Sequence, residues 1–126
     1  MHGLHLIADL HDCTCPAAHL LDRRALAVFC TDACRSHGLT VVGELFHAFT
    51  SADDQPAGVT GTVVLAESHL AVHTWPELRA VTVDLYVCNY SGDNSAAARN
   101  LFEAVLAHFA PASVDKKEVA RGHLRI

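Results

Sequence analysis

The chain has 126 residues, of which 51% are hydrophobic, and a formal net charge of -5 with neutral histidines. This length is typical of a single domain, residues 1–126, which can bury a core without disulfides. The acidic balance and the lack of Lys or Arg runs argue against nucleic-acid binding, and no apolar stretch approaches the ~20 residues of a membrane span.

The first half of the chain predicts a strand, a helix and a second strand. Residues 4–10 alternate between apolar and polar side chains, which is typical of a strand. Asp22 precedes an apolar stripe at helical spacing, and Gly38 follows at a position where helices commonly end. Residues 39–49 are rich in β-branched and aromatic side chains and predict another strand, which a polar loop over 51–58 follows.

The second half of the chain predicts more strands and one long helix. Asn94 is a suitable N-cap for a helix that ends near Phe109, with apolar residues at the spacing of a core-facing helix. The predicted strands cover 59–66, 68–74, 81–88 and, at the edge of the sheet, 114–124.

The order of these elements predicts the fold class. Two helices are too few to form parallel crossovers between so many strands, so most neighbouring strands are expected to be antiparallel. The predicted class is α+β, a two-layer α/β sandwich with a mainly antiparallel sheet and two helices on one face. Nothing in the chain remains to cover the other face, and we therefore expect a homodimer that forms through the sheets.

One short segment concentrates polar and aromatic residues that are unusual together in a strand. It reads Glu67-Ser68-His69-Leu70-Ala71-Val72-His73-Thr74-Trp75-Pro76-Glu77. On a regular strand Ser68 and His73 face opposite sides of the sheet, because they are five residues apart. A turn or bulge at Glu67-Ser68 would let Ser68 approach His73.

This segment resembles the processing site of the bacterial and archaeal S-adenosylmethionine decarboxylases, which are small pyruvoyl-dependent enzymes. The resemblance implies a cytoplasmic proenzyme that converts S-adenosylmethionine to CO2 and decarboxylated S-adenosylmethionine, the aminopropyl donor for spermidine synthesis. Similar stretches occur along nearly the whole chain, at Gly3-Leu4-His5-Leu6-Ile7-Ala8-Asp9, Phe46-His47-Ala48-Phe49, Gly58-Val59-Thr60-Gly61 and Asp84-Leu85-Tyr86-Val87-Cys88.

The resemblance implies that the proenzyme cleaves its own Glu67-Ser68 bond. Ser68 Oγ would attack the Glu67 carbonyl to form an ester, and loss of the Ser68 α-proton would then eliminate the Glu67 carboxylate. Tautomerisation and hydrolysis of the remaining dehydroalanine would give a pyruvoyl group and ammonia. The products would be a β chain of residues 1–67 and an α chain of residues 68–126.

The same resemblance implies roles for five further side chains. His73 is the expected base for the α-proton, since histidine titrates near neutrality, and the Thr60 hydroxyl, where many relatives have serine, is expected to assist cleavage. In the mature enzyme the pyruvoyl would form a Schiff base with the substrate amine. Cys88 would donate a proton to the α-carbon after CO2 leaves. Glu77 would contact the polar end of the substrate, and Phe49 and His73 would flank its adenine ring.

The cleavage motif alone leaves the substrate open. A pyruvoyl-dependent L-ornithine or L-arginine decarboxylase on the same scaffold is the alternative, since a guanidinium or ammonium favours carboxylates. Phe49 and His73 favour an adenosyl group, whereas Asp53, Asp54 and Asp93 keep the alternative open. A non-catalytic subunit of an active partner would be expected to lack the reactive serine, histidine or cysteine, and all three are present.

The cysteines raise the questions of disulfides and of a metal. Their odd number, five, without a secretion signal argues against a disulfide framework and for a cytosolic protein. Cys13-x-Cys15 and Cys30-x3-Cys34 offer side chains that zinc uses, but the spacing matches no closed zinc motif. Cys30 and Cys34 also lie on the apolar face of the predicted helix, so no metal is expected.

Overall fold

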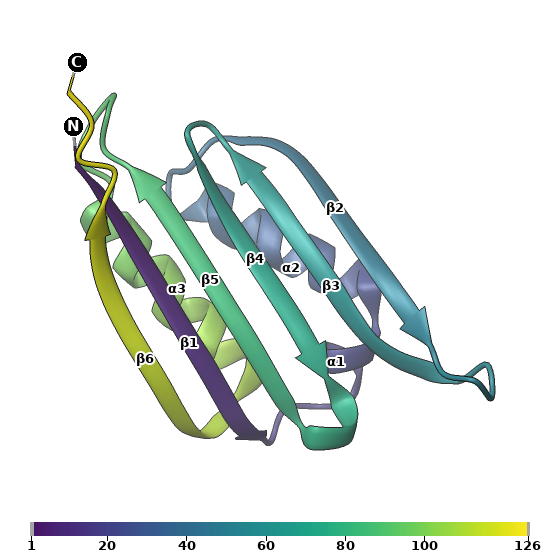
Figure 1. The fold of residues 1–126 in the computed structure, drawn as a ribbon. Coiled ribbons are helices and arrows are strands. Elements are labelled where there is room, and N and C mark those ends of the chain that lie inside the picture. Colours follow the sequence, from purple (N-terminus) through teal and green to yellow (C-terminus); the bar gives the residue numbers. More distant parts are fainter. Residues whose placement is uncertain (1, 126) are drawn as a thin grey trace.

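The computed structural model describes residues 2–125 and contains one six-stranded sheet with helices against it (Figure 1). The elements in chain order are β1 (Gly3–Cys13), α1 (Ala18–Leu21), α2 (Arg23–Ser36), β2 (Val41–Thr50), β3 (Pro56–Leu65), β4 (Ser68–Trp75), the 3-10 helix η1 (Pro76–Leu78), β5 (Ala80–Cys88), α3 (Ser95–Phe109) and β6 (Pro111–Arg121).

The sheet has the strand order β2-β3-β4-β5-β1-β6, and all of its neighbouring strands are antiparallel. The long helices α2 and α3 lie side by side behind the sheet in Figure 1. The α+β prediction is therefore confirmed, as is each predicted strand and long helix. The short α1 and η1 were not predicted, because elements of four and three residues are too short to show a periodic pattern. No helix within residues 2–125 is long and apolar enough to cross a membrane.

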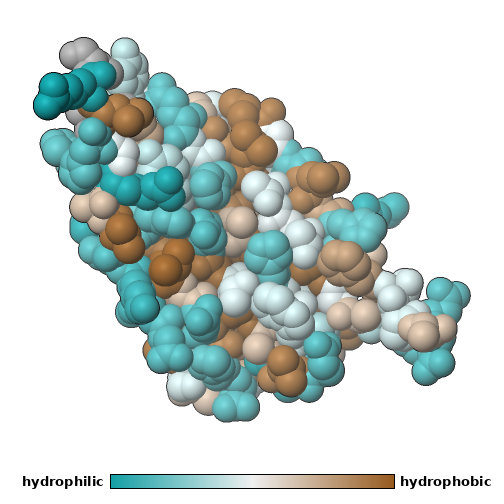
Figure 2. Space-filling view, in the orientation of Figure 1, coloured by the Kyte–Doolittle hydropathy of each residue, from teal (hydrophilic) through white to brown (hydrophobic). Residues whose placement is uncertain are grey.

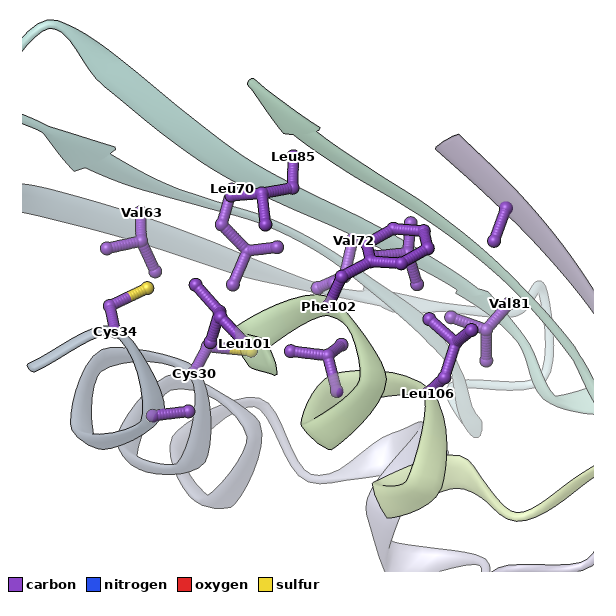
Figure 3. Close-up of a cluster of buried hydrophobic side chains, with 14 of the residues drawn as sticks. Cys30, Cys34, Val63, Leu70, Val72, Val81, Leu85, Leu101, Phe102 and Leu106 are labelled. Carbon is purple, nitrogen blue, oxygen red and sulfur yellow. The ribbon is translucent and has the colours of Figure 1, made fainter. Parts of the chain in front are cut away.

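The core lies between the inner face of the sheet and the two long helices (Figure 3). Asp22 begins α2 as predicted, because its side chain accepts a hydrogen bond from the backbone N of Ala25 at 3.0 Å. Strict alternation along β4 and β5 sends every second side chain toward the helices. The buried residues labelled in Figure 3 are Cys30, Cys34, Val63, Leu70, Val72, Val81, Leu85, Leu101, Phe102 and Leu106.

A stack of three rings fixes the end of α3. The His108 ring lies between Phe29 and His19, with centroid distances of 3.6 and 4.0 Å and interplanar angles of 9°. Burial, and then the nearby His19, lower the pKa of His108 from 6.5 to about 4. The folded state therefore favours the neutral form of His108.

We expect acid to destabilise the fold through this stack. A histidine whose folded pKa is lowered takes up its proton first in the unfolded chain, so its stabilisation is complete above pH 6.5 and is lost as the pH falls toward 4. The loss is expected to be about 2 kcal/mol. Thermal unfolding at pH 7 and near pH 4 should show a smaller loss for His108→Phe than for the parent. Equal losses would contradict this role of His108.

The opposite face of the sheet carries no helix among the described residues, and we call it the open face. It faces the viewer in Figures 1 and 2, and apolar residues are scattered over it. Strand alternation directs to it five large apolar side chains that are 40% to 76% exposed, namely Leu45, Phe49, Val64, Trp75 and Val119.

Candidate active site

Ser68 is the first residue of β4 and directly follows a tight turn. Leu65 and Ser68 pair across that turn, which consists of Ala66 and Glu67. Glu67 has a φ of 63°, in the left-handed region that costs a non-glycine residue about 1 kcal/mol. The turn expected at Glu67-Ser68 is therefore present, and the peptide bond between these residues lies in a strained, exposed connection.

Residues at and after the end of β5 contact both sides of this bond. The backbone N of Cys88 donates a hydrogen bond to Ser68 Oγ at 3.2 Å. Ser91 Oγ donates to Glu67 Oε2 at 3.1 Å. Asn94 Nδ2 donates to the carbonyl of Cys88 at 3.3 Å, and Cys88 itself is 6% exposed. Glu67, Ser68 and Cys88 therefore form one group at this end of the sheet.

The start of α3 differs in detail from the prediction. Asn94 stands at the N-cap position, but its side chain does not cap the helix. Asp93 Oδ1 instead accepts a hydrogen bond from the backbone N of Ser95 at 3.0 Å, and this bond lowers the pKa of Asp93. Asp93 therefore stabilises the start of the helix.

A second group lies on the open face near the other end of β4. Thr60 on β3 and His73 on β4 are register partners, and Thr60 Oγ1 lies 3.1 Å from His73 Nδ1. His47 on β2 occupies the same row, and its ring contacts Phe49 edge-on at a centroid distance of 4.7 Å. Strands β2 and β4 are about 9.6 Å apart, with β3 between them. Phe49 is two residues further along β2 than His47 and pairs with Gly58.

Glu77 belongs to the same end of the sheet. It lies in η1, directly after β4, and is exposed. With Asp12 and Arg79 it lines an open hollow between η1 and the end of β1. The structure thus brings Thr60, His73 and Phe49 to one region of the open face, with Glu77 beyond its edge.

The two groups are far apart within one chain. Strand β4 pairs with β3 from Ser68 to His73 without a register shift, so these residues are about 16 Å apart at ~3.3 Å per residue. The prediction that a turn or bulge at Glu67-Ser68 would let Ser68 approach His73 is wrong for this chain, because the turn precedes β4 and leaves the strand regular. Direct proton transfer requires a separation of ~3 Å, so His73 does not reach Ser68 of its own chain.

Sequence reasoning missed one polar cluster on the open face. Asp84 Oδ1 lies 2.7 Å from His5 Nε2 and 3.3 Å from His69 Nε2. These residues come from β5, β1 and β4. Arg121 of β6 also belongs to the cluster, because its Nη1 lies 3.1 Å from His5 Nδ1. Alternation marks each as an outward residue of its strand, but the sequence does not reveal which strands are neighbours.

The cysteines whose spacing raised the question of a metal are buried thiols. Burial raises the pKa of Cys34 to about 11, and burial together with Cys15 raises that of Cys13 to about 11. Protonated thiols of this kind behave as small apolar side chains. Among residues 2–125 no group of three or more His, Cys, Asp or Glu side chains is arranged to hold a metal ion.

Comparisons with known proteins point to one family. A family model described as S-adenosylmethionine decarboxylase matches residues 4–122. Relatives named S-adenosylmethionine decarboxylase proenzyme, from Hydrogenobaculum sp. and Picrophilus torridus, are 36% identical over 121 and 120 residues, which is 95% of this chain and 81% and 84% of theirs. The crystal structure of the adenosylmethionine decarboxylase from Aquifex aeolicus is 31% identical, with a TM-score of 0.81 over 98% of this chain and 92% of that chain.

Proposed function

The chain belongs to the S-adenosylmethionine decarboxylase family, and on that premise we propose that it is a self-cleaving, pyruvoyl-dependent carboxy-lyase that acts on S-adenosylmethionine. Its products are CO2 and decarboxylated S-adenosylmethionine, an aminopropyl donor for spermidine synthesis. All five cysteines are thiols, which is consistent with action in a reducing cytoplasm.

The observation that supports self-cleavage is the position of Ser68 beside a strained, exposed peptide bond. Ser68 Oγ attacks the Glu67 carbonyl carbon, and the amide becomes an ester. Removal of the Ser68 α-proton expels the Glu67 carboxylate, which takes the former Oγ with it. Water then replaces the nitrogen of residue 68, which leaves as ammonia. The products are the β chain, residues 1–67, and the α chain, residues 68–126.

The residues around position 68 fit a pyruvoyl group. Such a group supplies a ketone that condenses with the substrate amine and accepts the electrons left by departing CO2. Cys88 is held beside residue 68 by its backbone and by Asn94. Because Cys88 is only 6% exposed, its thiol is shielded from bulk water and suited to return a proton to the substrate α-carbon.

The separation of the two groups along β4 supports a site shared between two copies of the chain. In a homodimer of processed αβ protomers, two open faces pack together and bury the exposed apolar side chains. A two-fold axis that lies between the sheets and perpendicular to the strands places opposite strand ends over each other. His73 and Thr60 of one protomer then approach the backbone of Ser68 of the partner subunit, and His73 becomes the base that removes the α-proton of that residue.

The substrate is tested by measuring CO2 release from labelled S-adenosylmethionine, L-ornithine and L-arginine after an intact-mass spectrum. We expect two chains, with the α chain about 17 Da lighter than a serine-ended chain, and release from S-adenosylmethionine only. Phe49 and His73 support this choice, since aromatic faces suit an adenosyl sulfonium. Release from ornithine or arginine would contradict the proposed substrate while leaving the pyruvoyl in place.

Cys88→Ala is expected to cleave normally and to lower kcat by a factor of about 100 or more, because the substrate carbon loses its proton donor. Intact mass and CO2 release measure the two effects separately. Cys30→Ala, which removes a thiol of α2 that is buried in the core on the helix side of the sheet, is the control and should lower stability without changing kcat. Wild-type turnover by Cys88→Ala would remove Cys88 as the donor.

A further inference from the structure

Four polar side chains form a continuous line of contacts across the open face, and we call it the Asp84 cluster. It comprises Arg121, His5, Asp84 and His69, from β6, β1, β5 and β4. It ends at His69, the residue after Ser68. The His5, Asp84 and His69 side chains are 18%, 40% and 42% exposed.

The donors and acceptors of this line fit together in one direction. A guanidinium can only donate, so His5 Nδ1 accepts from Arg121, whose guanidinium also lies 4.9 Å from the Tyr86 ring centre. The proton of His5 is therefore on Nε2, which donates to Asp84 Oδ1 at 2.7 Å. The same oxygen accepts from His69 Nε2 at 3.3 Å.

Maturation removes most of what fixes residue 68 in the uncut chain. Cleavage breaks its link to Glu67 and so opens the tight turn that joins it to its register partner Leu65, and its backbone nitrogen is lost as ammonia. The oxygen that accepts from the Cys88 backbone N is lost as well. Pairing of β4 with β5 begins only at His69, opposite Tyr86. The new end of the α chain is thus a strand end without its former anchors, and such ends fray.

We propose that Asp84 is a positioning residue that fixes the pyruvoyl end of the mature α chain through His69. His69 has the first side chain after residue 68, and Asp84 is the residue of β5 that accepts a hydrogen bond from it. His5 and Arg121 orient the Asp84 carboxylate from the opposite side. The inference rests on the proposed cleavage at Glu67-Ser68, and it assigns to the Asp84 cluster a function that begins after that cleavage.

Asp84→Asn tests this role, with Asp115→Asn as the matched control. Asp115 Oδ2 also contacts a histidine, since it lies 3.1 Å from His11 Nε2. This contact is near one end of β1, whereas Asp84 contacts His5 near the other end. We expect Asp84→Asn to cleave and then to show about tenfold lower kcat. Its pyruvoyl should react faster with phenylhydrazine, and amides of residues 69–72 should exchange hydrogen about tenfold faster. The control should match the parent in all three measurements.

A pair of substitutions at His69 separates positioning from proton transfer. The Gln side chain retains an N–H donor near the position of Nε2, so His69→Gln should keep near-parental kcat and amide exchange. His69→Ala should have a lower kcat and faster exchange of these amides, as expected for Asp84→Asn. This pair also decides the matter if Asp84→Asn remains uncut. Equal losses in His69→Gln and His69→Ala would overturn the positioning role.

The outcomes distinguish this inference from the proposed function. A cleaved Asp84→Asn with parental kcat, phenylhydrazine reactivity and exchange would overturn the inference and leave self-cleavage intact. A parent chain that never cleaves would overturn both, since no pyruvoyl end would then exist to be positioned.

Discussion

Ser68→Ala is expected to yield one uncut chain of 126 residues with no detectable decarboxylase activity. Alanine has no oxygen to attack the Glu67 carbonyl, so neither the ester nor the ketone can form. Intact-mass spectrometry shows whether the chain is cut, and CO2 release from labelled S-adenosylmethionine measures the activity. The fold should survive, because Ser68 makes a single side-chain hydrogen bond among those described, to the backbone of Cys88.

Ser113→Ala is a suitable control for this experiment. Ser113 is an exposed serine on β6, paired with His11 and remote from the cleavage turn. It should cleave and turn over like the parent. Normal decarboxylation by Ser68→Ala would show that the pyruvoyl mechanism is wrong, whatever the family of the chain.

Co-expression of Ser68→Ala and His73→Ala chains is expected to restore cleavage that neither variant shows alone. If His73 acts on Ser68 of the partner subunit, a mixed dimer contains one complete site, formed by Ser68 of one chain and His73 of the other. Random pairing puts about half of the His73→Ala chains in such dimers. Mass spectrometry should therefore find α chains that carry the His73→Ala mass, together with partial decarboxylase activity.

A second mixture provides the control for complementation. Thr60 Oγ1 and His73 Nδ1 lie 3.1 Å apart, so both residues would contribute to a shared site from the same chain. Thr60→Ala and His73→Ala would therefore each damage the same half of that site. Their mixed dimers contain no complete site and should show no gain in cleavage over either variant alone. Failure of Ser68→Ala to rescue His73→Ala would rule out the shared site and require β4 to rearrange within one chain.

The proposed shared site would also account for the mixture of apolar and polar residues on the open face. Large exposed side chains such as Leu45, Trp75 and Val119 would supply apolar area for the proposed contact between sheets. The polar groups on this face include Thr60 and His73 near one end of β4, and Asp84 and His69 near the other. An interface that also forms the active site must keep these polar groups paired, as Thr60 with His73 and Asp84 with His69 do.

Local patterns in the sequence were sufficient to predict most of the fold. The alternation in β5 and the apolar stripes of α2 and α3 depend only on residue order, because strand and helix periods fix which side chains share a face. The same alternation placed Ser68 and His73 on opposite sides of β4, and the regular strand agrees with that prediction. The motif itself carried the resemblance to the family, since its residues are consecutive.

Local patterns could not predict which residues meet across strands. Thr60 meets His73, and Asp84 meets both His5 and His69, because of strand order and register, which depend on contacts between residues far apart in the chain. Register also excluded the approach of Ser68 to His73 within one chain. The elements, the open face and the cleavage motif therefore follow from residue order, whereas the two separate groups and the Asp84 cluster follow from the pairing of strands.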